Sequence, residues 1–398
     1  MSMPETLRCR IRQAFLRPGH RQGREPVVED GPGALYSVPQ LVRSERLSKP
    51  LLVAGPDAGP WADRLRQALE ESDVALSVWS GEAALTVDDA EAASLQWDAD
   101  RCDCFIAVGG PETIDLAKAA AARAVSGSRS VMDLIAAGRL GRRIPAVIAV
   151  PTAAGSGTEA LSWMTVCDTE GRRYRLEDPA LMPAFAVPDP ALIADTPRPA
   201  LASCVMNGIC LASEAYISRY ATDRTRSRAS EAMWAFLEMA EPCWNSGGTV
   251  EQRIRLLEAS RLAGLAASQA GAGYARALSE AYAAVTGTSF AEACAVILPA
   301  VLVKYGDHAA AELSELAAGA GVKASGTRRQ RAEALIDRLC GLAFRIGLPE
   351  TLEGAEPEAL SEAADTAAAT ANPRWASPVV WTAEDCERVL RAAIQNKI

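Results

Sequence analysis

The fold is decided by two stretches: residues 104–118, with the sequence CFIAVGGPETIDLAK, and residues 146–159, with the sequence AVIAVPTAAGSGTE. Each begins with a short apolar run, which predicts a buried strand. A double glycine and helical spacing follow the first run, and small and hydroxyl residues follow the second. Outside these stretches the pattern predicts strands at 51–55 and 74–79 and helices at 61–71 and 114–122. Continuous apolar strands that alternate with helices indicate a parallel sheet covered on both faces.

The chain changes character after about Pro199. It becomes rich in Ala, Leu, Glu and Arg, and its apolar residues recur every three or four positions. This spacing predicts helices at 203–220, 228–240, 250–268 and 278–285, and residues 295–303 could form either a strand or a buried helix. Prolines cluster at 188–199 and mark a seam. We therefore predict an α/β domain over residues 1–198 and an all-helical domain over residues 199–398.

The composition excludes several classes of protein. With 49% apolar and 23% charged residues in 398, the chain can bury a sizeable core. No apolar run approaches the roughly 18 residues of a membrane span. The net charge of −9 argues against a nucleic-acid partner. Because His20 and His308 are the only histidines, a site of three histidines is impossible.

The ten cysteines contain no C-x-x-C pair, which argues against a zinc ribbon. They predict buried thiols in a reducing compartment, so we expect a cytoplasmic protein. Six arginines fall within residues 8–24, without the apolar core of a secretory signal. We expect a solvated, partly frayed terminus there. Binding of this basic segment to an acidic partner is the alternative.

The two stretches carry the candidate chemistry, because ligands bind at the carboxyl ends of strands in an open parallel sheet. Gly109 and Gly110 would let backbone amides approach a pyrophosphate at the start of a helix, although a tight turn is the alternative. Residues 150–159 would suit a loop pressed against a flat ligand, and a flexible loop is the alternative there.

Together these stretches resemble the iron-containing (group III) alcohol dehydrogenase superfamily, which carries a G-G-G-S-x-x-D-x-A-K loop and a P-T-T-A-G-T-G-S-E loop in this order. Further similar segments lie at 30–34, 187–192, 206–216, 297–299 and 372–374. The resemblance covers residues 27–395. It implies an α/β dinucleotide-binding domain with a parallel sheet and an all-helical C-terminal domain, as in the dehydroquinate synthase-like fold, with the site in the cleft between them.

The resemblance also implies which residues bind the nicotinamide cofactor: Gly55, Gly109, Gly110, Glu112, Thr113, Asp115, Lys118, Thr152, Ala153 and Ser156. The first loop departs from the family at two positions. Pro111 removes an amide donor, and Glu112 brings a negative charge near the pyrophosphate. The family often has an Asp where this chain has Gly55, and that Asp holds the ribose of NAD. Without this carboxylate a 2′-phosphate is not repelled, so we favour NADP over NAD.

In the family one Asp and three His hold a divalent metal that polarises the substrate oxygen. By spacing, these positions fall on Asn207, Leu211, Arg276 and Phe290. Asn is a poor ligand, Leu and Phe are not ligands, and Arg repels a cation. We therefore predict that the protein binds no metal.

Residues at the former metal position could carry the chemistry instead. Arg276 and Glu280 lie four apart on a predicted helix and would form either a surface ion pair or part of the site. In the second case Arg276 would bind a carboxylate or stabilise a developing oxyanion, and Asn207 would donate a hydrogen bond to the same oxygen. Tyr274 is either an acid or a packed aromatic residue.

These observations favour a metal-independent NAD(P)-dependent oxidoreductase that acts on a hydroxy or keto substrate bearing a carboxylate. A 3-hydroxy acid would suit it, since the 3-keto product loses carbon dioxide without a metal. Dehydrogenases of peptide natural-product (RiPP) clusters, such as the daptide type that oxidatively decarboxylates a C-terminal Thr, fit this description. We expect a small-molecule or peptide substrate and a homodimer or a complex with a partner protein.

Two alternatives remain. One is a catalytically inactive scaffold or regulatory subunit, which the changes at Pro111 and Glu112 and the lost metal ligands favour. The other is a cyclising synthase related to dehydroquinate synthase. Because those enzymes depend on a metal, the histidine count argues against this possibility.

Overall fold

A computed structural model describes residues 5–15, 24–80 and 85–395. The chain divides into two compact units between Thr196 and Pro197, close to the predicted boundary at residue 198. The predicted assignment of the whole N-terminal segment to the α/β domain is wrong, because helix α1 (Glu5–Phe15) belongs to the helical unit. Nor is this part of the terminus frayed, because Cys9 and Gln13 on α1 are buried.

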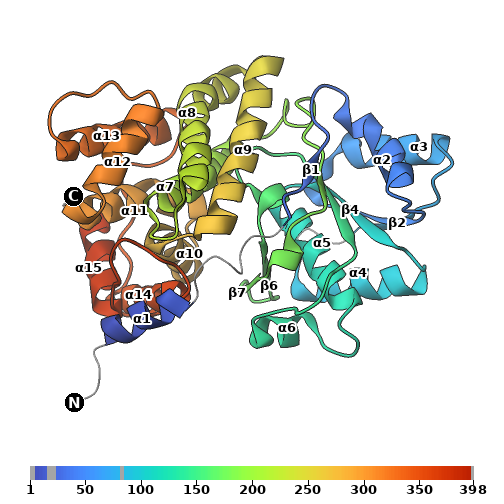
Figure 1. Ribbon diagram of the computed structural model, residues 1–398, viewed down its shortest axis with the longest axis horizontal. Helices are drawn as coiled ribbons and strands as arrows, with labels where there is room; N and C mark the ends of the chain where they lie inside the picture. The colour runs from blue at the N-terminus through green and yellow to red at the C-terminus, as the bar shows by residue number, and fades with distance from the viewer. Residues whose placement is uncertain (1–4, 16–23, 81–84, 396–398) are drawn as a thin grey trace. The chain divides into compact units, whose positions relative to one another are not determined.

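The α/β unit is built on a parallel sheet, as predicted, and this sheet has six strands (Figure 1). Its strands are β1 (Val27–Val28), β2 (Pro50–Ala54), β3 (Ser77–Ser80), β4 (Cys104–Gly109), β5 (Ala146–Pro151) and β8 (Phe185–Ala186). They lie in the order β1-β8-β5-β4-β2-β3, and every neighbouring pair is parallel. Strand β2 therefore lies between β3 and β4, so the strand order reverses there. Such a switch point is where open α/β sheets bind ligands.

Each central strand sends alternate side chains to opposite faces of the sheet. On β4, Phe105 and Ala107 pack into one hydrophobic cluster, and Ile106 and Val108 pack into the other. Helices α2 (Val38–Ser44) and α3 (Pro60–Glu71) cover the second face. Helices α4 (Val87–Ala99), α5 (Pro111–Ala124) and α6 (Val131–Ala137) cover the first face. This two-sided burial explains why the strands are continuous apolar runs.

An antiparallel hairpin of β6 (Trp163–Cys167) and β7 (Arg173–Glu177) extends the α/β unit and packs on α5. The sequence patterns did not predict this hairpin, nor strands β1 and β8 or helices α2, α4 and α6. The 3-10 helices are η2 (Ala34–Ser37), η3 (Pro56–Ala58), η4 (Thr158–Ala160), η5 (Pro179–Leu181) and η6 (Gly306–His308).

The second unit is helical throughout the part of Pro197–Gln395 that the structure describes, as predicted. Besides α1, its helices are α7 (Arg198–Ile217), α8 (Asp223–Ser246), α9 (Val250–Ala270), α10 (Tyr274–Thr286), α11 (Phe290–Tyr305), α12 (Ala310–Gly319), α13 (Arg328–Arg345), α14 (Pro357–Ala371) and α15 (Ala383–Ile394). The ambiguous residues 295–303 lie inside α11, so they form a buried helix. Many of these helices begin at a capping box, as α8 does at Thr222 and α9 at Thr249.

Helix α7 lies at the centre of the helical unit and packs against α8, α9 and α11. By length and hydropathy it could cross a membrane, with a mean hydropathy of 1.4 over its most apolar window. However, 83% of that window is buried inside the unit. Its apolar character is therefore that of a core helix.

Candidate functional site

The predicted nucleotide loops lie side by side at the carboxyl ends of β2, β4 and β5. Gly55 follows β2, and its N–H donates to the carbonyl of Val108 on β4, at 3.3 Å. Thr152 follows β5, and its N–H donates to the carbonyl of Gly109, at 3.1 Å. The sheet thus brings together backbone from all three loops at its switch point, where a dinucleotide would bind.

The first loop leads directly into helix α5. Gly110 is the N-cap, with extended backbone, and Pro111 is the first helical residue. Proline suits this position, because the N–H that it lacks would have no partner inside the helix. It still removes one of the amides that an anion could use. Glu112 is exposed in the first turn, where its charge stabilises the helix dipole and opposes a phosphate.

Lys118 is a structural brace rather than a group facing a ligand. Its side chain is fully buried. The ammonium Nζ donates to the carbonyl of Thr158 at 2.7 Å and to those of Leu161 and Trp163 at 3.1 Å. Because an ammonium has three protons, these bonds occupy its donor capacity. These contacts favour a structural role for Lys118, which fastens the second loop to α5, over its predicted role in cofactor binding.

Asp115 completes this brace. One carboxylate oxygen lies 3.3 Å from Lys118 Nζ, and the other accepts from the N–H of Thr165 at 2.9 Å. Burial raises the pKa of Asp115 and lowers the pKa of Lys118. The attraction between the two charges opposes both shifts. These contacts likewise favour a structural role for Asp115 over its predicted role in cofactor binding, since its oxygens hold α5 and β6 together.

The second loop is an ordered element of the unit. Residues 151–161 are all buried, which argues against the flexible loop considered above. Gly155 and Gly157 have φ angles of 129° and 68°, which residues with a side chain rarely adopt. Ala153 and Ser156 are 7% and 2% exposed. Thr113, on α5, is also fully buried, so its side chain packs in the interior.

A second polar cluster lies in the helical unit, around Arg276 on α10. Its Nη1 donates to Oδ1 of Asn207 on α7, and its Nη2 lies 2.8 Å from Oε1 of Glu280. Its guanidinium carbon lies 5.5 Å from the ring centre of Phe290 on α11. Leu211, one turn after Asn207 on α7, is fully buried. Three helices thus bring Asn207, Arg276 and Phe290 together, as their assignment to one site requires.

The ion pair of Arg276 and Glu280 is largely buried. The two side chains are only 10% and 16% exposed, so the surface pair considered above is not what forms. Burial acts to lower the pKa of Arg276, but the attraction of Glu280 and other neighbours outweighs it and the pKa is raised. The guanidinium is thus a permanent cation held in fixed geometry.

These residues do not fit a divalent metal ion. A fixed guanidinium occupies the cluster, and it would repel a second cation. Among the described residues, no three His, Cys, Asp or Glu side chains are grouped so as to hold a metal ion. His308 is exposed at the end of η6, and His20 lies outside the described residues.

Glu214 is a functional candidate that sequence analysis missed, although it lies in the motif at 206–216. Its buried carboxylate caps helix α10, accepting from the N–H groups of Gly273 at 2.8 Å, Ala275 at 2.7 Å and Arg276 at 3.4 Å. Burial raises the pKa of this carboxyl to about 7, although the three hydrogen bonds act to lower it. A Cβ on Gly273 would lie 2.6 Å from Oε1 of Glu214, so a larger residue there would displace this carboxylate from its position.

Tyr274 is a packed aromatic residue. It is 1% exposed, and its ring stacks on that of Trp381 with centroids 4.8 Å apart. Its hydroxyl donates to Oδ1 of Asn372 at 2.6 Å and accepts from the N–H of Trp381 at 2.8 Å. Burial raises its pKa, which further disfavours proton transfer. The structure thus favours the packing alternative over the predicted acid.

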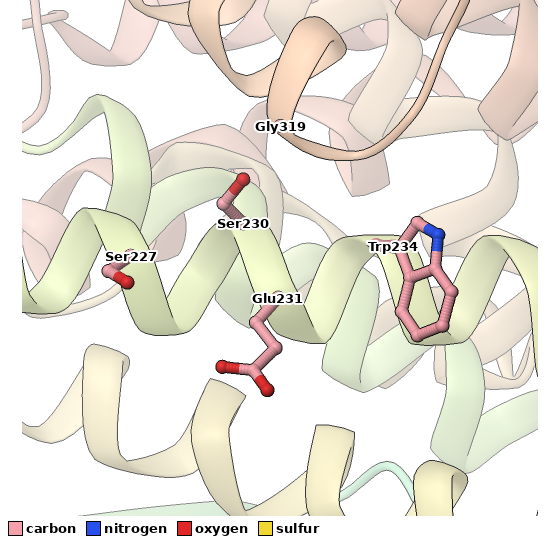
Figure 2. Close-up of a pocket in the computed structure, with 5 residues that line it drawn as sticks. All are labelled: Ser227, Ser230, Glu231, Trp234 and Gly319. Carbon is pink, nitrogen blue, oxygen red and sulfur yellow. The ribbon is translucent and has the colours of Figure 1, made fainter.

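A surface pocket lies elsewhere in the helical unit, between α8 and α12 (Figure 2). It is lined by Ser227, Ser230, Glu231, Trp234 and Gly319. None of the predicted site residues lines it, so it is separate from the Arg276 cluster.

Comparison with known proteins agrees with this architecture. Residues 26–190 match the family described as iron-containing alcohol dehydrogenase, and residues 201–394 match the C-terminal domain of that family. Phosphonoacetaldehyde reductase of Streptomyces viridochromogenes is 34% identical over 278 residues, which cover 68% of this chain and 69% of that protein.

Two solved structures share the fold. The 1,3-propanediol oxidoreductase structure has a TM-score of 0.87 at 23% identity and covers 94% of this chain and 99% of its own. Sulfoacetaldehyde reductase from Bifidobacterium kashiwanohense, solved with NAD+, has a TM-score of 0.81 at 22% identity, with 94% and 98% covered. The chain therefore belongs to the iron-containing alcohol dehydrogenase family of oxidoreductases.

Proposed function

We propose that the protein is a metal-independent NAD(P)-dependent oxidoreductase that interconverts a hydroxyl and a carbonyl group. The observation that carries the proposal is the buried Arg276, held by Asn207 and Glu280, at a position that motif spacing assigns to one of the metal ligands of the family. The similar proteins are named as dehydrogenases and reductases, which supports the reaction class.

Arg276 would take over the electrostatic role of a metal. A Lewis acid supplies several kcal/mol of transition-state stabilisation, so a metal-free enzyme needs another positive group. A fixed guanidinium can stabilise negative charge that develops on the substrate oxygen. Asn207 and Glu280 hold it in one orientation, so little reorganisation is needed. When bound, the nicotinamide would accept or donate the hydride.

The contacts of Arg276 bear on the substrate. Its two terminal nitrogens are already engaged, one by Asn207 and the other by Glu280. A guanidinium carries five N–H groups, so these two contacts do not by themselves decide between a substrate carboxylate and the reacting oxygen. We assign Arg276 to the reacting oxygen, because a metal-free site needs a positive group there, and a substrate carboxylate to another group.

We extend the proposal to 3-hydroxy acids, including a C-terminal Thr of a peptide in natural-product (RiPP) biosynthesis. Oxidation of such a group gives a 3-keto acid, which loses carbon dioxide without a metal. This reaction fits a site whose cation is an arginine. Phosphonoacetaldehyde reductase, the relative named above, is itself named for an aldehyde that bears an acidic group.

For the cofactor we propose NADP in preference to NAD. Gly55 stands at the end of β2, where a carboxylate would repel the 2′-phosphate. The observation against NADP is that the structure of the similar sulfoacetaldehyde reductase was solved with NAD+. We also propose a cytoplasmic protein that acts as a homodimer or with a protein partner.

The alternative is a catalytically inactive scaffold or regulatory subunit. Three observations favour it: Pro111 removes an amide, Glu112 places a charge at the start of α5, and Lys118 is fully occupied as a brace. This alternative predicts either no nucleotide binding or binding without turnover.

The first experiment is a titration of the metal-stripped protein with NADPH and NADH, followed by nicotinamide fluorescence. Saturable binding is the expected result, and turnover of hydroxy or keto acids should persist in the presence of a chelator. Absence of binding at millimolar cofactor would shift the conclusion to the scaffold. Turnover that needs an added divalent metal would overturn the metal-independent mechanism.

A further inference from the structure

Helix α1 lies outside the region that matches the family, which begins at residue 26. It nevertheless packs on the helical unit. Cys9 and Gln13, four residues apart, share one face of the helix and are 6% and 2% exposed. Their burial means that α1 is docked through a specific face.

That face is fastened by hydrogen bonds to two segments. Gln13 Nε2 donates to the carbonyl of Trp375 at 2.8 Å, and the thiol of Cys9 donates to Oδ1 of Asn372 at 3.5 Å. Arg219 donates to Oε1 of Gln13 at 3.4 Å, and the hydroxyl of Tyr220 donates to the carbonyl of Gln13. In Figure 1, α1 (blue) lies beside α14 (red), whose C-cap is Asn372.

The segment from Asn372 to Trp381 contacts both α1 and the start of α10. Asn372 Oδ1 accepts from the hydroxyl of Tyr274, and its Nδ2 donates to the carbonyl of Trp381 at 2.8 Å. Tyr274 is the first residue of α10, and Arg276 lies two residues later. Oδ1 of Asn372 is therefore shared between α1 and the helix that carries Arg276.

The same segment also lies close to the cap of α10. A Cβ on Gly273 would lie 3.2 Å from Oγ of Ser377, beside Glu214. The carbonyl of Ala376 accepts from the N–H of Arg219 at 2.7 Å. The segment is thus held by α1, by the end of α7 and by the start of α10.

We propose that α1 is a positioning element that holds the Asn372–Trp381 segment against the start of α10 and so fixes the orientation of Arg276. Gln13 is its central positioning residue, because its side chain and its carbonyl bond both the segment and the turn after α7. The functional part of this inference rests on the proposed role of Arg276.

The test compares Gln13→Met, which keeps side-chain length but removes the polar atoms, with Gln13→Ala. Arg12→Ala is the matched control, because Arg12 is the exposed neighbour on the same helix. Hydrogen exchange is followed at the amides of Gly273, Ala275 and Arg276, which Glu214 holds.

We expect exchange at these three amides to rise about fivefold in the Gln13 variants, as the loss of one hydrogen bond implies. The control should match the unchanged protein. In turnover assays kcat should fall while the dissociation constant of the cofactor stays the same. Unchanged exchange, or exchange that rises uniformly across the helical unit, would overturn the proposal. The exchange result holds even if no turnover is found, so it separates this inference from the proposed function.

Discussion

Replacement of Lys118 by Met tests whether this lysine braces the α/β unit or contacts the cofactor. The change keeps the apolar stem and removes the ammonium, which donates to three backbone carbonyls and pairs with Asp115. Removing one partner of a buried ion pair costs about 3–5 kcal/mol, since the other charge is left without compensation. That is a large part of a typical free energy of unfolding, which is about 5–15 kcal/mol.

The assay is urea unfolding without cofactor, followed by circular dichroism. The midpoint should fall by roughly 1–2 M for a loss of this size. Lys304→Met, at an exposed position on α11, is the control and should leave the midpoint unchanged. In the double variant Lys118→Met/Asp115→Asn, the loss should be smaller than the sum of the two single losses, because neither charge is then left alone.

One result would refute this reasoning. If Lys118→Met unfolded at the same urea concentration as the unchanged protein but lost its affinity for the cofactor, the lysine would contact the phosphates directly. Its carbonyl bonds would then contribute nothing measurable to stability.

Three further predictions concern the helical unit. Arg276→Ala should lower kcat about 10²–10³-fold if it removes an oxyanion donor, with cofactor affinity unchanged in fluorescence titration. Glu280→Gln should have a smaller effect than Arg276→Ala, either as a raised KM or as a smaller fall in kcat, because the guanidinium stays but loses its partner. Steady-state kinetics on the two variants tests this prediction. The carboxyl of Glu214 has a pKa raised from 4.5 to about 7, so its stabilising contribution is greatest below pH 4.5 and is lost as the pH rises to 7. Urea unfolding of Glu214→Gln beside the unchanged protein should therefore show a difference that shifts in favour of the variant by up to about 3 kcal/mol between pH 4.5 and 7.5. A difference that stays constant over this range would contradict the raised pKa.

Part of the α/β unit could be predicted from local patterns. The strands at β2, β4 and β5 are apolar runs, because both faces of the sheet are buried. Helix α4 was missed, although Thr86 and Asp89 form a capping box at its start. The β6–β7 hairpin was missed because β7 mixes apolar and charged residues, and one of the anchors of β6 is the distant Lys118.

Part of the candidate site could likewise be predicted from the sequence, and part of it could not. Motif spacing identified Asn207, Arg276 and Phe290 as one group, and the structure brings them into contact. Spacing could not distinguish a buried pair of Arg276 and Glu280 from a surface pair, because both have the same i,i+4 separation. Nor could it distinguish Lys118 as a brace from Lys118 as a ligand, because the chemistry of an ammonium suits both roles.

Local sequence patterns were enough to identify the family and the order of the two domains, and to predict which residues stand at the metal-ligand positions of the family. These follow from local hydrophobic periodicity, from motifs and from a histidine count, none of which needs a contact between distant residues. Three features could be seen only in the folded chain: α1 docks on the helical unit, Glu214 caps α10, and Lys118 faces inward. Each of these depends on a hydrogen bond across 40 or more positions of sequence, and such a partner is specified by the packing of the whole unit.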